Sequence, residues 1–287
     1  MKIQHLLITM FNIKVWDKNK NNQNTLTKEW LQRRFDLFER YCLPSIARQS
    51  VKEFEWLCLF DVDTPNEYKR KLINYQKLCP QLKPIYIKTS IGEDFRTKIS
   101  QVINESVNPK ATHILTTNID NDDAVHKDIV KELQKSAYEK SREGLYNFFF
   151  GYQYFEDINL ILKMKYPHNH FQSLLVKNKP NFKNIKDFWH AELRKLFDTV
   201  EICPNIPMWM EVVHKGNVSN DLRITSRIKN TCPKGPLSLI DFGQKIELTV
   251  AECRFNKFIT YPRLFTVIGL SKLKRKVFKI VKDKKIT

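Results

Sequence analysis

Three carboxylates, those of Asp120, Asp122 and Asp123, occur within four positions near the middle of this chain, directly after the apolar stretch His113–Leu115. A buried strand that ends in clustered acids is costly unless a cation neutralises them. Carboxylates at this spacing suit Mn²⁺ or Mg²⁺, with substrate phosphates completing the coordination. The alternative is a turn rich in Asp and Asn that caps a helix beginning near Ala124. On spacing alone, the run fits both interpretations.

The first half of the chain predicts the elements that would position these acids. Apolar segments predict strands, and helical patterns follow them in alternation: strands 3–10, 54–60, 84–88 and 112–118, and helices 30–48 (interrupted near Pro44), 65–78, 94–106 and 124–140. This alternation predicts a parallel sheet covered by helices, whose ligands bind beyond the carboxyl ends of the strands. We therefore expect Asn12, Asp61, Asp63 and the acidic run to line one crevice. Asp63 could equally cap the turn at Thr64.

The second half changes character. Apolar segments at 145–150, 152–162 and 171–177 predict further strands, and 187–199 predicts an amphipathic helix. We place a domain boundary near 235, with the catalytic domain at 1–235 and a helical extension at 236–287. Residues 265–283 combine apolar side chains with lysines, which is typical of a basic amphipathic helix on an anionic membrane. The alternative is a solvated terminal helix packed on the domain.

Composition narrows the functional classes. The formal net charge is +18, which favours an anionic partner such as nucleic acid, a membrane surface or a phosphorylated substrate. No cluster of arginines with stacking aromatics occurs, so we expect no specific nucleic-acid binding. The six cysteines are scattered without C-x-x-C spacing, which predicts reduced thiols in a cytoplasmic protein. No apolar run is long enough to span a bilayer, and the first residues are interpreted as a strand and not as a signal peptide.

Several segments together carry a resemblance to a known family. They are His5–Thr9 with Phe11-Asn12, Leu43–Ile46 with Gln49, Phe54–Leu57, Phe60-Asp61, Thr64-Pro65, Thr116-Thr117, Ile119–Ala124, Trp209–His214 and Asn217–Asn220. With these residues, which span roughly 5–220, the chain resembles the rhamnosyltransferase family of GT-A type, bacterial glycosyltransferases of surface-polysaccharide synthesis. The acidic block and the Trp209–Asn220 block are the specific parts. The family pattern has Arg where Met10 and Asn118 stand and a second Gly where Lys215 stands, so donor choice can differ here.

The resemblance implies a GT-A fold, a Rossmann-like mixed sheet flanked by helices, and a nucleotide-sugar donor linked to UDP or dTDP. It also implies a divalent metal, Mn²⁺ or Mg²⁺. The D-x-D motif maps onto Asp120, which would contact the ribose or a metal-bound water, and Asp122, which would bind the metal. A cation is chemically appropriate, because charge builds on the departing diphosphate. Asp123 could be a ligand as well, but we favour a helix cap.

The remaining site residues are assigned by position and chemistry. Asn12 and Asp61 are placed to bind the base and ribose, and Arg96, with Lys98, could neutralise diphosphate, although a solvated helix face explains both. Glu211 lies where such inverting enzymes place their base, and the alternative is a surface glutamate on a helix. His214, one helical turn on, could be a metal ligand or could be structural. His168 and His170 could contact the acceptor, but a polar loop is the simpler interpretation.

The first hypothesis is a glycosyltransferase that acts on a glycan or lipid-linked acceptor in capsule or O-antigen synthesis. It would work at the inner face of the cytoplasmic membrane. Two other functions are alternatives to it. One is a metal-dependent phosphohydrolase or nuclease, which would need more carboxylates or histidines to hold two metals. The other is a non-catalytic nucleic-acid-binding protein, which only the charge suggests. Binding of nucleoside diphosphate with Mn²⁺ distinguishes the first function from both.

Overall fold

The computed structural model describes residues 1–15, 17–18, 24–92, 94–214 and 229–266. Its main helices are α1 (Lys28–Leu37), α2 (Leu43–Ala47), α3 (Asn66–Leu78), α4 (Phe95–Glu105), α5 (Ile129–Lys140), α6 (His190–Leu196) and α7 (Val250–Phe255). Its strands are β1 (Ile3–Met10), β2 (Glu55–Asp61), β3 (Leu82–Ile87), β4 (His113–Asn118), β5 (Ala124–Val125), β6 (Gly144–Phe148), β7 (Phe150–Phe155), β8 (Leu160–Lys165), β9 (Ser173–Lys177), β10 (Thr199–Ile202), β11 (Trp209–Val213), β12 (Lys229–Thr231), β13 (Leu237–Ser238) and β14 (Glu247–Leu248).

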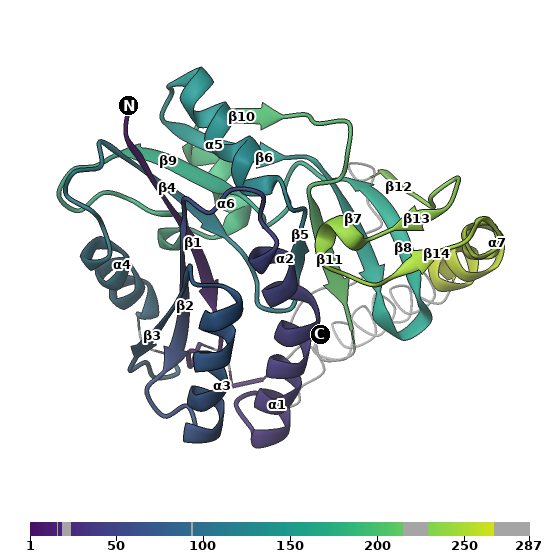
Figure 1. The fold of residues 1–287 in the computed structure, drawn as a ribbon, viewed down its shortest axis with the longest axis horizontal. Helices are drawn as coiled ribbons and strands as arrows, with labels where there is room; N and C mark the ends of the chain where they lie inside the picture. The colour runs from purple at the N-terminus through teal and green to yellow at the C-terminus, as the bar shows by residue number, and fades with distance from the viewer. Residues whose placement is uncertain (16, 19–23, 93, 215–228, 267–287) are drawn as a thin grey trace, which may run out of the picture.

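A seven-stranded mixed sheet forms the centre, in the order β10-β6-β9-β4-β1-β2-β3 (Figure 1). Strand β9 runs antiparallel to both of its neighbours, β4 and β6, whereas the other adjacent pairs are parallel. The acidic run therefore follows a central strand, β4, which pairs with β1 along its whole length. This arrangement confirms the predicted GT-A type sheet.

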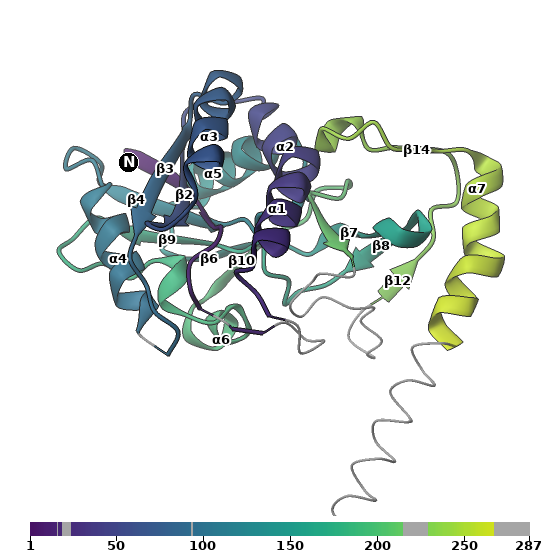
Figure 2. The same cartoon turned by 90° about the horizontal axis from the view of Figure 1, so that it is seen from below.

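Helices cover both faces of this sheet, as Figure 2 shows. Side chains alternate between the faces, so Leu7 packs in one core cluster with α1, α3 and α5, whereas Leu6 packs in another with α4 and α6. Both faces are thus buried, which explains why the strands are almost continuously apolar. The sheet is a rigid platform, and its carboxyl edge carries the polar residues discussed below.

A second sheet, in the order β12-β8-β7-β11-β5, stands beside the first. Strand β11 lies parallel to β7, and Gly151 is opposite Trp209 in this pair. A Cβ at Gly151 would lie 2.1 Å from the Trp209 ring, so only glycine lets the indole lie across β7. The Trp209 ring in turn stacks on Phe171, with centroids 5.2 Å apart. This packing fixes β11 against the segment that carries His170.

Some predicted elements differ from the structure. The helix expected at 124–140 begins only at Ile129, because Ala124 and Val125 pair with β11 as a short strand. The strand expected at 152–162 is the β7–β8 hairpin, which turns at Asn159 with φ 46°. The helix expected at 187–199 is limited to α6, and a 3₁₀ turn at Ile185–Asp187 precedes it. The remaining strands and helices of the first half agree with the prediction.

Residues 236–266 form the short β13–β14 pair, α7 and a helical continuation to residue 266. Leu239 and Phe242 pack in the same core cluster as Tyr41 and Tyr152 of the preceding chain. The division at 235 stays a prediction. Most of the predicted membrane-associating segment, residues 267–287, lies outside the described residues. Within the described part, no helix has both the length and the apolar character needed to cross a membrane.

Candidate active site

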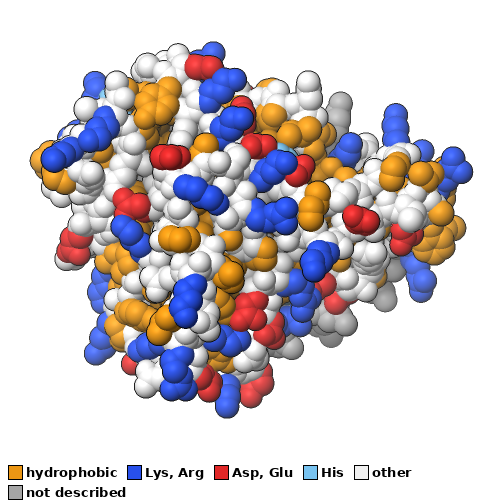
Figure 3. Space-filling model, in the orientation of Figure 1, with side chains coloured by type: hydrophobic (Ala, Val, Ile, Leu, Met, Phe, Trp, Pro, Cys, Tyr) orange, Lys and Arg blue, Asp and Glu red, His pale blue; other side chains and the backbone are white. Residues whose placement is uncertain are grey.

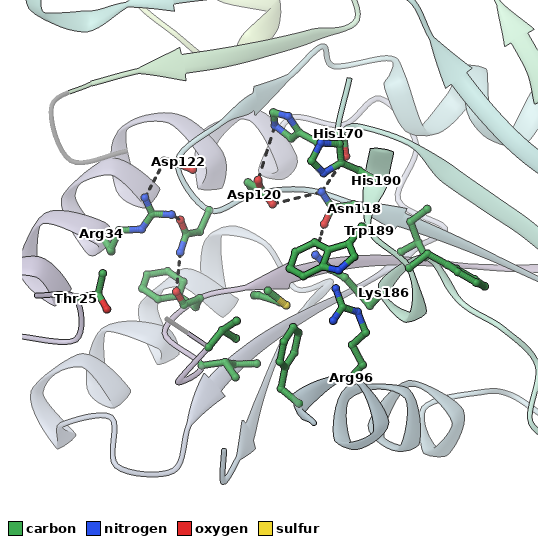
Figure 4. A pocket seen from close by; sticks show the side chains of 18 of the residues that line it. Thr25, Arg34, Arg96, Asn118, Asp120, Asp122, His170, Lys186, Trp189 and His190 are labelled. Carbon is green, nitrogen blue, oxygen red and sulfur yellow. Dashed lines mark hydrogen bonds and ion pairs between the residues drawn. The ribbon is translucent and has the colours of Figure 1, made fainter. Parts of the chain in front are cut away.

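A cavity of about 480 Å³ opens beyond the carboxyl ends of β1 and β4 (Figure 4). Its polar lining comes from four parts of the chain: Arg34 on α1, Arg96 on α4, Asn118 to Asp122 after β4, and His170, Lys186 and His190 from the second half. Its apolar lining includes Phe11, Trp30, Phe95, Phe188 and Trp189. A cavity with apolar walls and a few convergent charges is the usual form of a small-molecule site.

Asp122 is buried in an ion pair. The Arg34 guanidinium donates to Asp122 Oδ2 across 2.7 Å, and the side chains are only 13% and 6% exposed. Arg34 also donates to the Asn121 side chain, and His214 Nε2 lies 3.0 Å from the same Asp122 oxygen. Burial alone would raise the pKa of Asp122, but the Arg34 charge and the His214 contact outweigh it and hold that pKa well below its usual range. The carboxylate is therefore ionised and already neutralised by protein groups.

Asp123 has different partners from Asp122. Its Oδ1 accepts from the Val212 backbone N–H at 2.8 Å, and its Oδ2 lies 2.6 Å from His170 Nε2. The predicted cap role for Asp123 is wrong, because α5 begins six residues further on and the side chain is fully buried between β11 and His170. Asp123 instead joins three segments distant in the sequence.

The pair of Asp123 and His170 retains a proton. Burial raises the pKa of Asp123 to about 7, despite the opposing contact with His170. For His170, burial alone would lower the pKa, but the hydrogen bond and charge of Asp123 outweigh it and raise the pKa to about 9. The second carboxylate near this ring is Asp120, whose Oδ2 lies 3.8 Å from His170 Nε2. Asp120 is the exposed member of the group, since 45% of its side chain reaches solvent.

Lys186 brings a cation into the same cavity. It donates to Asn118 Oδ1, while Asn118 Nδ2 donates to Asp120 Oδ1 at 3.3 Å. Burial lowers the pKa of Lys186, although the charge of Asp120 opposes that shift. The Asn118 amide thus links an acid to a base at the end of β4, as Figure 4 shows. Lys186 lies directly before the helix predicted at 187–199, and the sequence offered no reason to expect a site residue there.

Arg96, at the start of α4, lines the cavity, and its predicted contact with a diphosphate stays a prediction. Its guanidinium carbon lies 4.0 Å from the Trp189 ring centroid, a cation–π contact between α4 and the segment before α6. Asp94 caps the helix by accepting from the Arg96 N–H at 3.2 Å. The helix N-terminus and the guanidinium together make this wall of the cavity suitable for an anion.

Asn12 and Asp61 do not line this cavity. They lie at a second one of about 600 Å³, which shares Leu26 and Trp30 with the first. Asn12 Oδ1 accepts from the Asp61 N–H at 3.1 Å, and Asn12 Nδ2 donates to Thr64 at 3.0 Å. Asp61 pairs with Lys14 at 3.2 Å, and among described residues its Oδ2 has no hydrogen-bond partner. The single predicted crevice is thus two neighbouring cavities, and the proposed contacts of Asn12 and Asp61 with a donor stay a prediction.

Glu211 lies on β11 and not on a helix, so the spacing of one helical turn to His214 does not apply. Its side chain is 2% exposed, and Gln153 Nε2 donates to Glu211 Oε2 at 2.9 Å. Its charge is close enough to act on His170. A role as catalytic base stays a prediction for this residue. The predicted Asn217–Asn220 block, which follows, lies outside the described residues.

The donor atoms suit a divalent cation, although in a different combination from the predicted one. Asp120, Asp123 and His170 each offer a ligand atom, and these atoms lie within 4.8 Å of one another. Carboxylate oxygens with one imidazole are acceptable ligands for Mn²⁺. The predicted set was Asp120, Asp122 and His214, and its Asp122 oxygen instead accepts from Arg34 and contacts His214. Whether either set binds metal stays a prediction.

Arg34 and Trp189, like Lys186, gave no distinct signal in the sequence. Arg34 sits between Leu31 and Phe35, so its only mark is a charge at the edge of a buried helical stripe. Trp189 directly precedes α6, where the sequence predicted a longer helix. Its 44% exposure could not be inferred from the sequence. The sequence suggests His170 as a contact for the acceptor, but its pairing with Asp123 could not be inferred from spacing.

The mixed sheet of this order, flanked by helices and with Asp120 and Asp122 in a cavity at its carboxyl edge, is the architecture expected for a GT-A type protein. The chain belongs to the family described as "Putative rhamnosyl transferase", whose model matches residues 5–226. This confirms both the predicted family and the class of enzyme. No curated protein matches the chain.

The chain is also similar to several solved structures. S. aureus TarS 1–349 in complex with UDP-GlcNAc is 12% identical over 76% of this chain and 60% of that chain, with a TM-score of 0.45. A "putative nucleotide-diphospho-sugar transferase" from Desulfovibrio desulfuricans G20 is 8% identical over 74% of this chain and 82% of that one, with a TM-score of 0.33. The chain thus spans about 60% of TarS 1–349. At these TM-scores the similarities carry no argument about substrate.

Proposed function

We propose that this glycosyltransferase moves a hexose or deoxyhexose, of rhamnose or galactose type, from a UDP- or dTDP-linked donor to a glycan or lipid-linked acceptor. The reaction would serve bacterial capsule or O-antigen synthesis and would invert the anomeric carbon. One observation carries the proposal: exposed Asp120 shares a cavity with the cations Arg34, Arg96 and Lys186. A sugar diphosphate needs such cations around its phosphates, and the carboxylate can accept from ribose hydroxyls or hold a metal.

We infer that a divalent cation is part of the site. Asp120, Asp123 and His170 would hold it, and the alternative set is Asp120 and Asp122, the two aspartates of the D-x-D motif, with His214. Bound there, Mn²⁺ or Mg²⁺ would supply positive charge to the diphosphate leaving group. Arg96 and Lys186 would bind and orient the phosphates, since both line the same cavity as Asp120.

Glu211 is the proposed base. In the transfer step the acceptor oxygen forms a bond to C1 of the sugar, the bond from C1 to the phosphate oxygen breaks, and the acceptor proton passes to the Glu211 carboxylate. Its position on β11 supports this role, because the next residue, Val212, donates its backbone N–H to Asp123. Gln153 would hold the carboxylate in place through its hydrogen bond to Oε2. Glu211→Gln should slow turnover by about 10²- to 10⁴-fold and leave donor affinity unchanged.

We place the enzyme at the inner face of the cytoplasmic membrane, with its basic C-terminal segment against anionic lipid. From Ser271 to Lys285 the sequence carries eight basic residues and one acid, which supports this location. This membrane location is independent of the chemistry in the cavity.

The decisive experiment is a thermal-shift screen of nucleoside diphosphates and nucleotide sugars, with and without Mn²⁺, followed by slow donor hydrolysis. UDP or dTDP should stabilise the wild type, and Mn²⁺ should increase the effect. Asp120→Asn should lose most of the shift, whereas Asp157→Asn, an exposed acid on the β7–β8 turn, should keep it. An Asp120→Asn protein that binds donor and metal as the wild type does would refute the site. Polynucleotide binding or phosphatase activity without sugar transfer would favour the other functions considered above.

A further inference from the structure

Residues 250–266 form one helical segment that has two apolar faces. One face packs on the protein: Cys253 is buried in the cluster that contains Tyr152, and Tyr261 and Leu264 pack against the cluster of Phe155 and Leu160. Asn256 fixes the same side by donating to the Asn159 carbonyl at 3.2 Å. The helix is thus anchored to the end of the β7–β8 hairpin.

The opposite face points to solvent. Its apolar members follow the spacing i, i+3, i+4, i+7 and i+10: Phe255, Phe258, Ile259, Pro262 and Phe265. Phe255 is 60% exposed, Phe258 66%, Ile259 52% and Phe265 47%. Isolated apolar side chains on a surface are common, but a continuous stripe of large ones marks a place of contact. We call these five residues the aromatic face.

The charges beside the aromatic face are basic. Arg254, Lys257 and Arg263 are exposed in the same segment, and its single acid, Glu252, is bonded to Thr249 in the helix cap. Figure 3 shows the hydrophobic side chains at the α7 end of the molecule with Lys and Arg side chains next to them. The segment continues directly into the basic sequence that follows residue 266.

We propose that the aromatic face docks on an anionic lipid surface. Phenylalanines on one side and Lys and Arg at its margins are the composition of helices that lie in the plane of a membrane interface. A protein partner would not require basic residues along both margins, whereas anionic headgroups do. The proposal deepens the membrane association suggested above and gives it a different place, on a helix held rigidly by the catalytic domain. The distance from cavity to membrane would then be fixed by the fold, which suits a lipid-linked acceptor.

Flotation of the full chain with vesicles tests this inference. The wild type should float with vesicles of phosphatidylcholine and 30% phosphatidylglycerol, and less with pure phosphatidylcholine. Phe255→Ser with Phe258→Ser should reduce binding by about tenfold or more, because each removes a large apolar side chain from the interface. Ile73→Ser with Leu78→Ser removes two equally exposed apolar residues from α3 and should bind as the wild type does. Since all variants keep residues 267–287, the tail is constant.

Two results would overturn the proposal. The first is flotation of the Phe255→Ser, Phe258→Ser protein equal to the wild type. The second is a stable dimer that this double substitution dissociates, because a second copy would then occupy the face. Donor-induced thermal shifts, measured on the same proteins, should be unchanged. A loss of flotation with intact donor binding therefore separates this inference from the proposed catalytic function.

Discussion

Arg34 and Asp122, 88 residues apart, form an ion pair at the mouth of the cavity, with Nη1 and Oδ2 2.7 Å apart. Arg34 Nε is buried and has no hydrogen-bond partner among the described residues. The pair joins α1, on one face of the sheet, to the run that follows β4. In this structure Asp122 is therefore neutralised by a guanidinium, whereas Asp120, which lines the same cavity, has the more exposed side chain.

Substitution of Arg34 should destabilise the protein. Arg34→Ala removes the guanidinium from the buried Asp122 carboxylate, and breaking a buried pair in this way costs about 3 kcal/mol. Urea unfolding measures the change. Arg33→Ala, one residue away and 46% exposed, should cost little. Adding Asp122→Asn to Arg34→Ala should recover part of the loss, and no recovery would mean that the pair is not the source of the effect.

The two candidate metal sets make opposite predictions. If Asp120, Asp123 and His170 hold the cation, His170→Ala should weaken Mn²⁺ binding by at least about tenfold, while His214→Ala should affect it far less. Isothermal titration calorimetry on both proteins, after treatment with EDTA, measures the affinities. The reverse order of effects would restore Asp122 and His214 as the ligands. Circular dichroism should verify that each variant is folded, since both histidines are buried.

Arg96 should contribute to donor binding. Arg96→Ala removes a charged donor from the cavity wall and should weaken UDP affinity by about tenfold, which corresponds to about 1.4 kcal/mol. Arg96→Lys should recover only part of this, because Lys lacks the planar group that lies over Trp189. Lys98→Ala is the matched control, since Lys98 is half-buried, does not line the cavity and donates to the Lys88 carbonyl. Equal losses for Arg96→Ala and Lys98→Ala would indicate a general charge effect.

His5 should make stability depend on pH. Complete burial lowers its pKa from 6.5 to about 3. Below pH 6.5, His5 therefore binds a proton in the unfolded chain but stays neutral in the folded chain, so stability falls as the pH drops toward 3. At pH 5 the expected loss is about 2 kcal/mol relative to pH 7. His5→Gln should lose correspondingly less between these pH values in urea unfolding.

His113 lies on β4, the strand that pairs with β1, and its side chain reaches solvent. A matched substitution there should leave the pH dependence of stability close to that of the wild type. If His5→Gln and the wild type lose the same stability between pH 7 and pH 5, another group is responsible. The test does not depend on the active site, because His5 hydrogen-bonds to Thr117 and neither residue lines the cavity.

The sequence by itself determined the strands and helices of the first half, because apolar periodicity reports directly which faces are buried. It also determined where the acids would be, since a strand that ends in Asp120 to Asp123 must deliver them to the carboxyl edge of the sheet. Tertiary structure alone decided their partners. Arg34 and His170 reach the acids from 88 and 47 residues away, and Lys186 reaches Asn118 beside them from 68 residues away. No local periodicity encodes those distances. Spacing likewise suggested a cap for Asp123, but the pairing of β5 with β11 delayed the helix and turned that side chain toward His170.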